Sequence, residues 1–161
     1  MLGVRMSTAH IYRVQVSWTG NCGNGTRDYR AYSRDHEVTT GGCPSIAGSA
    51  DQTFRGDPTR WNPEQLLVAA LSQCHMLWYL HMCADAGVVV TAYRDDAVGT
   101  MTQNRSGGHF TEVVLRPTVE VADADMVERA EALHADAHRA CFIASSVNFP
   151  VAHQPVVRIS T

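Results

Sequence analysis

The chain has 161 residues, of which 45% are hydrophobic and 18% charged, and its net charge is −3. This composition is that of an ordinary soluble globular protein, and the length favours one domain with a substantial core. The slightly negative charge gives no support to nucleic-acid or membrane-surface binding.

Residues 1–161 are expected to form a single domain, in which residues 1–9 are a flexible N-terminus. The first ten residues contain no apolar h-region, so we expect no signal peptide. Residues 66–90 are long enough to span a bilayer but carry polar groups such as His75 and Asp85. These groups are costly in hydrocarbon, so the segment predicts a buried core helix and no membrane association.

The first predicted elements are strands. Apolar and polar residues alternate over residues 11–18, which is the period of a half-buried strand. Residues 29–38 indicate a second, charged strand. A turn at residues 41–44 and a polar loop over residues 51–61 complete this part of the chain.

A long helix is predicted from Asn62 to Gly87. Asn62 can cap the helix, Pro63 suits the first helical position, and Glu64 favours the positive end of the helix dipole. Gly87 suits the position just past the last turn. The helix is apolar on most faces, so it has to be covered on most faces.

A β-hairpin follows the helix. Residues 88–103 and 109–121 are predicted to be its strands, and the sequence NRSGG at residues 104–108 is its turn.

A second helix is expected to begin near Asp123 or Asp125, either of which can cap it, and to end near Cys141. Residues 156–159 then indicate a closing strand. The order of strands, helix, hairpin, helix and strand predicts an α+β fold with a mainly antiparallel sheet and two helices.

The five cysteines are widely spaced and odd in number. They are Cys22, Cys43, Cys74, Cys83 and Cys141. This pattern argues against a structural disulfide framework and favours a reducing, cytoplasmic location. Cys22 and Cys43 lie in predicted loops, as free thiols or as weak metal ligands with His10 or His36. No CxxC spacing supports a zinc site.

Cys74 lies in the middle of the long helix, and Cys141 is the best candidate for its partner. Cys83 is excluded, because nine helical residues place it on the opposite face and about 13.5 Å along the axis. Cys83 is therefore interpreted as core packing. Two readings of Cys74 and Cys141 remain open, namely inert core cysteines and a redox pair.

If Cys74 is a nucleophile, its thiol needs activation, because an unperturbed thiol is largely protonated at pH 7. Cys74 is too far from the start of its helix to gain from the dipole. A guanidinium is the most plausible stabiliser. The candidates among the arginines that precede the helix are Arg27, Arg30, Arg34, Arg55 and Arg60.

The segment from Asn62 to Cys74 resembles the OsmC/Ohr family, the osmotically inducible protein C and organic hydroperoxide resistance proteins. That family has Asn-Pro-Glu at the start of its central helix and a peroxidatic cysteine ten residues after the Glu, as Glu64 and Cys74 are spaced here. Its resolving cysteine follows the second helix, where Cys141 lies. The run from Gly25 to Asp28 resembles the Ohr-type loop that carries an essential arginine.

The resemblance implies a cysteine-based peroxidase. Cys74 would reduce an organic hydroperoxide to an alcohol and become a sulfenic acid, and Cys141 would then form a disulfide with it. An external dithiol, of lipoyl type or a small thiol, would reset the pair. Arg27 would hold the thiolate, and Glu64 would orient Arg27 through a charge-assisted pair. No metal, flavin or other cofactor is needed.

The resemblance also implies an intertwined homodimer with its sites at the interface. Ten helical residues place Glu64 about 15 Å along the axis from Cys74, so a straight helix does not let the two side chains touch. A long arginine, a bend in the helix or the second subunit would have to connect them.

Two departures from the family pattern leave open whether the chain is of the Ohr type or the OsmC type. Phe142 stands where the family commonly has proline, and residues 54–57 resemble the OsmC-type arginine loop with the arginine shifted. Arg55 is therefore the alternative to Arg27. His75 next to Cys74 is interpreted as packing. The alternative function is a non-catalytic redox sensor or small-ligand-binding module on the same fold.

Overall fold

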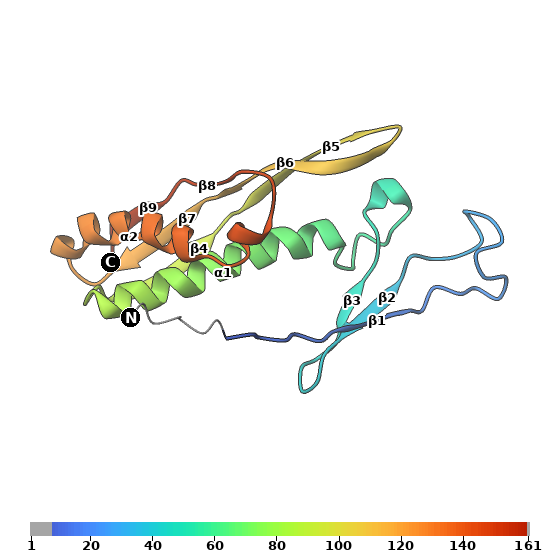
Figure 1. Ribbon diagram of the computed structural model, residues 1–161, viewed down its shortest axis with the longest axis horizontal. Helices are drawn as coiled ribbons and strands as arrows, with labels where there is room; N and C mark the ends of the chain where they lie inside the picture. Colours follow the sequence, from blue (N-terminus) through green and yellow to red (C-terminus); the bar gives the residue numbers. More distant parts are fainter. Residues whose placement is uncertain (1–7, 161) are drawn as a thin grey trace, which may run out of the picture. The chain divides into compact units, whose positions relative to one another are not determined.

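The computed structural model describes residues 8–160, and the expected flexible N-terminus at residues 1–9 lies mostly outside them. The chain divides into two compact units, Met1–Glu64 and Gln65–Thr161. Figure 1 follows the elements of each unit in chain order. Their order of strands, helix, strands, helix and strands is the α+β class that the sequence predicts.

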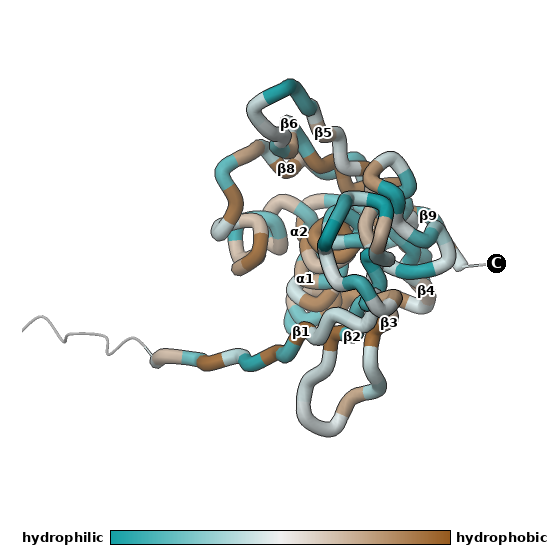
Figure 2. Tube along the Cα trace, turned by 90° about the vertical axis from the view of Figure 1, so that its right-hand side faces the viewer, coloured by the Kyte–Doolittle hydropathy of each residue, from teal (hydrophilic) through white to brown (hydrophobic). Residues whose placement is uncertain are grey.

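The first unit holds an antiparallel sheet of three short strands. They are β1 (Gln15–Trp18), β2 (His36–Thr39) and β3 (Ile46–Gly48), in that spatial order. The segment leading into β1 alternates between teal and brown in Figure 2, as the predicted strand requires. The strand itself covers only Gln15–Trp18, however, and all four of its residues are exposed in the single chain. No predicted element corresponds to β3.

The prediction of a strand over residues 29–38 is wrong in its first half, because the side chain of Arg34 holds that segment in a loop. The Arg34 guanidinium donates hydrogen bonds to the carbonyl oxygens of Tyr32 and Tyr29, at 2.6 and 2.7 Å. It also lies 4.3 Å from the centroid of each tyrosine ring. Cation–π contacts and hydrogen bonds to one guanidinium therefore replace ladder pairing here.

The loop before the long helix is tied to the sheet through its backbone. Its single helical turn, η1 (Gln52–Phe54), is capped by Asp51, which accepts a hydrogen bond from the Thr53 N–H at 2.7 Å. Trp61 donates to the carbonyl of Ala47 at 3.1 Å and accepts from the Ser49 N–H at 2.8 Å. These bonds set the point at which the long helix begins.

The long helix α1 (Pro63–Asp85) has the predicted bounds. Gly87 ends it with a φ of 72°, a conformation that glycine adopts without a Cβ penalty, and the Val88 N–H bonds back to the Cys83 carbonyl at 2.9 Å. Its buried residues recur every fourth position, at Leu71, His75, Tyr79 and Cys83. By length and composition α1 is apolar enough to cross a membrane, and the core helix of a soluble domain meets the same criterion.

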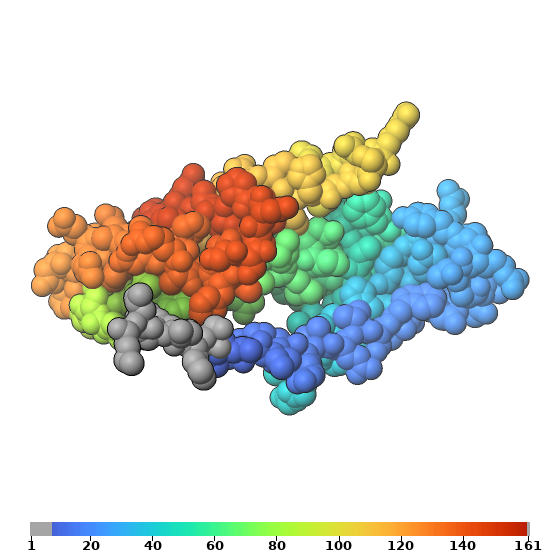
Figure 3. Space-filling model, viewed as in Figure 1, coloured from blue at the N-terminus to red at the C-terminus, as the bar shows by residue number. Residues whose placement is uncertain are grey.

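The second unit adds six strands in two sheets. The strands are β4 (Val90–Asp95), β5 (Val98–Asn104), β6 (Gly107–Leu115), β7 (Pro117–Val121), β8 (Val151–His153) and β9 (Val156–Ile159). The sheet orders are β4-β7-β9 and β5-β6-β8. Neighbours are antiparallel except that β8 and β9 pair in parallel with β6 and β7. Figure 3 draws the β5–β6 hairpin in yellow, and its residues 101–109 are all exposed.

The predicted strands over residues 88–103 and 109–121 are each broken in two, because the chain passes from one sheet to the other. Asp95 holds this corner. One carboxylate oxygen accepts from the Ser72 hydroxyl at 2.5 Å, and the other accepts from the Arg116 N–H at 2.6 Å. The predicted turn at residues 104–108 is confirmed, since Asn104 pairs with Gly107 across the hairpin.

The second helix α2 (Val127–Ala140) begins later than the sequence predicts. A short turn, η2 (Ala124–Met126), comes first, and neither expected aspartate caps α2. Asp123 precedes η2 with no side-chain capping bond, and Met126 occupies the cap position of α2. The closing strand at residues 156–159 is confirmed as β9.

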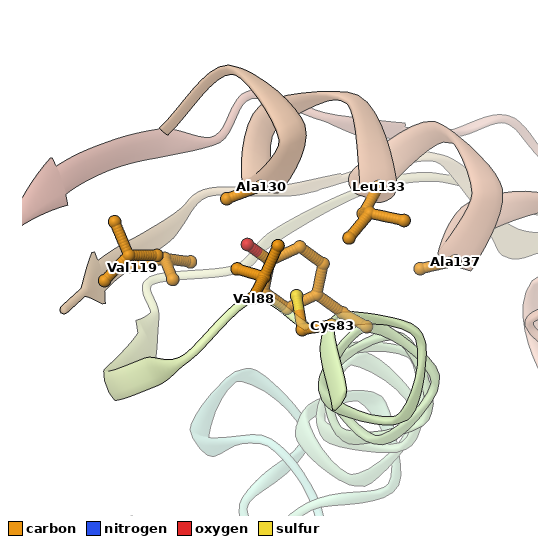
Figure 4. Close-up of a cluster of buried hydrophobic side chains, with 8 residues drawn as sticks. Cys83, Val88, Val119, Ala130, Leu133 and Ala137 are labelled. Carbon is orange, nitrogen blue, oxygen red and sulfur yellow. The ribbon is translucent and has the colours of Figure 1, made fainter. Parts of the chain in front are cut away.

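The main core cluster lies between α1, α2 and the β4-β7-β9 sheet. In Figure 4, Cys83 of α1 points toward Ala130 and Leu133 of α2, with Val119 of β7 at the side. A smaller cluster, centred on Leu71 of α1, packs against β6. The two helices are thus held against the sheets of their own unit.

Candidate functional site

The two thiols that the sequence singles out meet in the second unit. Cys74 is partly buried on α1, and Cys141, the residue that ends α2, is 1% exposed. The two thiols are close enough that the Cys74 side chain helps to raise the pKa of Cys141. Sixty-six residues of chain separate them, so the contact exists because α1 and α2 pack side by side.

The two thiols have different surroundings. Burial raises the pKa of Cys141 to about 11, and the Cys74 thiol adds to this effect. The Ala144 N–H, which donates to the Cys141 sulfur at 3.4 Å, opposes it. Cys141 is therefore a protonated thiol at neutral pH, while Cys74 is the more accessible of the two sulfurs.

An aromatic pair stands beside the thiols. Trp78 follows Cys74 by four residues, which places it one turn along the same face of α1. Phe142 directly follows Cys141. The two rings meet edge to face with their centroids 5.3 Å apart. Phe142 is 68% exposed, so this pair presents an apolar surface at the thiols.

Cys83 has no part in this arrangement. It is 1% exposed within the main core cluster, so the prediction that it packs in the core is confirmed. Burial raises the pKa of its thiol, and the Tyr79 side chain faces it. Cys22 and Cys43 are both exposed, as predicted for loop residues. Over residues 8–160 no group of three or more His, Cys, Asp or Glu side chains has the geometry of a metal site.

The predicted partners Glu64, Arg27 and Arg55 belong to the first unit. Glu64 lies in the first turn of α1 and lines a cavity of about 380 Å³. Arg27 and Arg55 are exposed, and each is adjacent in sequence to a residue that lines the same cavity, Thr26 and Phe54. Among the described residues, no ion pair joins Glu64 to either arginine.

Two of the five candidate arginines before α1 are already engaged. Arg34 is held by the two tyrosines described above, and Arg60 pairs with Glu37 at 3.2 Å and with Asp35 at 3.9 Å. Their guanidinium groups stabilise the first unit. The three other candidates, Arg27, Arg30 and Arg55, are exposed.

A cluster of histidines next to the thiols was missed by the sequence reasoning. His75 is fully buried as packing, as predicted, but its partner is His134 of α2, also fully buried. The nitrogens Nε2 of His75 and Nδ1 of His134 are 3.0 Å apart. The available signal was the four-residue spacing of His134 and His138, which puts both on one face of α2.

The fold and the site together define a small α+β protein whose two helices bring a pair of thiols into contact. The chain belongs to the family described as OsmC-like protein, which its residues 56–155 match over more than half of its length.

Solved structures agree with this family. An OsmC-like protein of unknown function from Vibrio cholerae is 33% identical, with a TM-score of 0.82 over 92% of this chain and 100% of that one. An organic hydroperoxide resistance protein from Elizabethkingia anophelis is 18% identical, with a TM-score of 0.65 over 95% and 100% of the two chains. A putative organic hydroperoxide resistance protein from Vibrio cholerae is 22% identical, with a TM-score of 0.62 over 96% and 95%. No curated protein matches the chain.

Proposed function

We propose that this protein is a thiol-dependent peroxidase that reduces organic hydroperoxides to alcohols. The observation that carries the proposal is the proximity of Cys74, a partly buried thiol, to Cys141, a buried one. The names of the structural relatives from Elizabethkingia anophelis and Vibrio cholerae support the choice of substrate.

In the first half of the reaction, the Cys74 thiolate attacks the outer oxygen of the hydroperoxide. The O–O bond breaks, the alkoxide takes up a proton and leaves as the alcohol, and Cys74 becomes a sulfenic acid. Cys141 does not compete for the peroxide, because its raised pKa keeps it protonated at neutral pH.

In the second half, the Cys141 sulfur attacks the Cys74 sulfenic sulfur. The S–O bond breaks, the hydroxide takes the Cys141 proton and leaves as water, and a disulfide forms. An external dithiol, of lipoyl type or a small thiol, then supplies two electrons and two protons and restores both thiols. No cofactor is required in either half.

The apolar substrate tail is held by the aromatic pair of Trp78 and Phe142. An edge-to-face pair at the mouth of a site offers aliphatic or aromatic tails a surface that excludes water. Hydrogen peroxide has no tail to place there, so the site favours organic hydroperoxides.

An arginine from the first unit activates Cys74, and Glu64 orients it. Arg27 is the first candidate and Arg55 the alternative, because both side chains are exposed and unengaged within residues 8–160. The test compares Arg27→Gln and Arg55→Gln with Arg30→Gln as a matched control. We expect one of the first two to lower kcat/KM by roughly 100-fold or more, and equal activity of all three variants would remove both candidates.

The protein acts as a cytoplasmic homodimer with its sites at the interface. Two surfaces of the single chain support this. Alternate apolar residues in and before β1 are exposed, namely Tyr12, Val14, Val16 and Trp18. On α1, Leu77 is 61% exposed. Size-exclusion chromatography with light scattering is expected to give a molar mass of twice the 17.6 kDa of one chain. A measured mass equal to that of one chain would contradict the dimer.

The decisive experiment follows cumene hydroperoxide consumption in the presence of dihydrolipoamide. Cys74→Ser is expected to abolish turnover, and Cys83→Ser, a substitution at a core thiol, to leave the rate per folded molecule unchanged. Unchanged turnover in Cys74→Ser rejects the proposal. Formation of the Cys74–Cys141 disulfide without turnover by any dithiol identifies a redox sensor instead.

A further inference from the structure

Four histidines form a stack beside the thiol pair. His75 comes from α1, His134 and His138 from α2, and His153 from β8. The rings of His75 and His134 are nearly parallel, with centroids 5.3 Å apart, and His153 lies 5.7 Å from His75 and 5.3 Å from His138. Tyr79 closes the stack on the other side, 3.9 Å from His134.

The hydrogen bond between His75 and His134 needs at least one neutral ring to act as acceptor. One of the facing nitrogens donates and the other accepts at 3.0 Å, so two protonated rings would place two N–H groups against each other. The outward nitrogens, Nδ1 of His75 and Nε2 of His134, are buried without a partner. A proton added to either ring therefore creates a buried charge that nothing solvates.

The groups around the stack offer no compensation for such a charge. The neighbouring titratable groups are Tyr79 of α1 and Tyr93 of β4. Burial raises the pKa of each tyrosine above its ordinary value, so both remain neutral and supply no negative charge. Beyond Tyr79 lie Cys83 of α1 and the exposed Glu131 and Arg129 of α2, and beyond Tyr93 lies Asp95. Across residues 8–160, no carboxylate forms an ion pair with any of the four histidines.

The stack and the thiol pair share the same contact between helices. His75 directly follows Cys74 on α1, and the Cys141 N–H donates to the carbonyl of His138 at 3.3 Å on α2. His134 precedes Cys141 by seven residues, or about two helical turns, so both lie on one face of α2. The His75–His134 bond therefore draws together the two helices that carry the two sulfurs.

We propose that His75 and His134 are positioning residues for the thiols, a clamp that holds Cys74 against Cys141 while its rings are neutral and releases them when it takes up protons. The proposal rests on the disulfide step of the proposed function but not on peroxide turnover. The released state lets the rings reach water, where their ordinary affinity for protons returns.

The direction of the effect follows from burial. Burial lowers the pKa of His75 to about 4 and that of His134 to about 3, with further lowering by neighbouring histidines. Burial also lowers the pKa of His153. The released state binds more protons than the clamped state below about pH 6.5, so acid favours release and weakens the thiol contact.

The first test measures the thiol–disulfide equilibrium of the whole protein in a glutathione redox buffer, with a diselenide catalyst so that equilibrium is reached in acid. The dithiol and oxidised glutathione give the disulfide and two molecules of reduced glutathione. We expect the equilibrium constant of the unaltered protein to fall by roughly tenfold or more as the pH is lowered from about 7 to about 4.5.

The double variant His75→Gln with His134→Asn keeps the hydrogen bond without a titrating ring, because Gln places its amide near the position of Nε2 and Asn near that of Nδ1. Its equilibrium constant is expected to change with pH at least several-fold less than that of the unaltered protein. Titration of the thiols is common to both proteins, so it cancels when the equilibrium constant of the variant is divided by that of the unaltered protein at each pH. His109→Gln, at an exposed position in β6, is the matched control and is expected to behave like the unaltered protein. Parallel curves for the double variant and the unaltered protein overturn the clamp.

The second test needs no variant. By linkage, if protons weaken the thiol contact, the disulfide must weaken proton binding by the same factor. Imidazole resonances of His75 and His134 are followed against pH in the reduced and oxidised proteins. The midpoint of acid release is expected to be lower in the oxidised protein by about half a pH unit or more, and equal midpoints overturn the proposal. A protein that shows the shift but no peroxide turnover retains the clamp and loses the proposed function.

Discussion

The Trp78 indole of α1 and the Phe142 ring after α2 meet at an interplanar angle of 90° beside the two interacting thiols. Trp78 and Cys74 both lie on α1, and Phe142 and Cys141 both lie at the end of α2. Each sulfur therefore has an aromatic neighbour from its own segment. The aromatic pair and the thiol pair both lie where α1 packs against the end of α2.

Phe142→Ala is expected to raise KM for cumene hydroperoxide by roughly threefold to tenfold, the equivalent of about 0.5–1.5 kcal/mol for one aromatic pair. Activity with hydrogen peroxide, which has no apolar tail, should change little. Phe142→Leu keeps apolar area without the edge-to-face contact, so its KM for cumene hydroperoxide should lie between those of the unaltered protein and Phe142→Ala. Steady-state kinetics with both peroxides checks this, and equal losses for both substrates would count against a tail-binding surface.

A stoichiometric pulse of organic hydroperoxide is expected to lower the intact mass by about 2 Da, the two hydrogens lost when a disulfide forms. Peptide mapping should assign the bond to Cys74 and Cys141. In Cys141→Ser the disulfide cannot form, so a dimedone adduct should appear on Cys74. A disulfide that involves Cys22 or Cys43 instead would contradict the site.

Stability is expected to decline in mild acid because of the buried histidines. The pKa values of His75 and His134, about 4 and about 3, lie below the ordinary 6.5. The unfolded state therefore binds more protons, and stability falls as the pH drops from about 6.5. Each ring contributes a loss of about 2 kcal/mol between pH 7 and pH 5.

Urea unfolding at the two pH values measures this loss. His75→Gln with His134→Asn should be less sensitive to acid by about the sum of the two contributions. An unfolding free energy of the unaltered protein that stays constant between these pH values would contradict the burial of neutral rings.

The Asp95 corner is expected to contribute to stability through both carboxylate oxygens. Ser72→Ala should cost about 1 kcal/mol and Asp95→Ala about 2–3 kcal/mol, since the latter also leaves the Arg116 N–H without its acceptor. A double-mutant cycle measured by urea unfolding isolates the interaction free energy between Ser72 and Asp95. Ser106→Ala, in the exposed hairpin turn, is the control and should change stability by less than about 0.5 kcal/mol.

The long helix was predictable because its signals are local. Pro63 at the first position, Glu64 in the first turn and Gly87 beyond the end act within a few residues of each other, and the structure places α1 at the bounds they indicate. The strands were less predictable, because their ends depend on distant partners. No local sequence signal near Asp95 predicts its hydrogen bonds to Ser72 and Arg116, which mark the point where one predicted strand divides into two.

Local pattern also misplaced two segments. Residues 29–34 have the composition of a strand, yet one guanidinium between two tyrosine rings outweighs their ladder hydrogen bonds. Asp123 and Asp125 are good capping residues, yet the helix that follows begins only at Val127.

The sequence by itself determined the α+β class, the two helices and the spacing of Glu64 and Cys74, since these depend on neighbours along the chain. It could name Cys141 as the partner of Cys74 only among open alternatives. Only the tertiary structure decided that the two thiols lie next to each other and that His75 bonds to His134. The first contact joins α1 to the residue that ends α2, and the second joins α1 to the middle of α2. Such contacts arise from the burial of shared apolar faces, whose register no local pattern encodes.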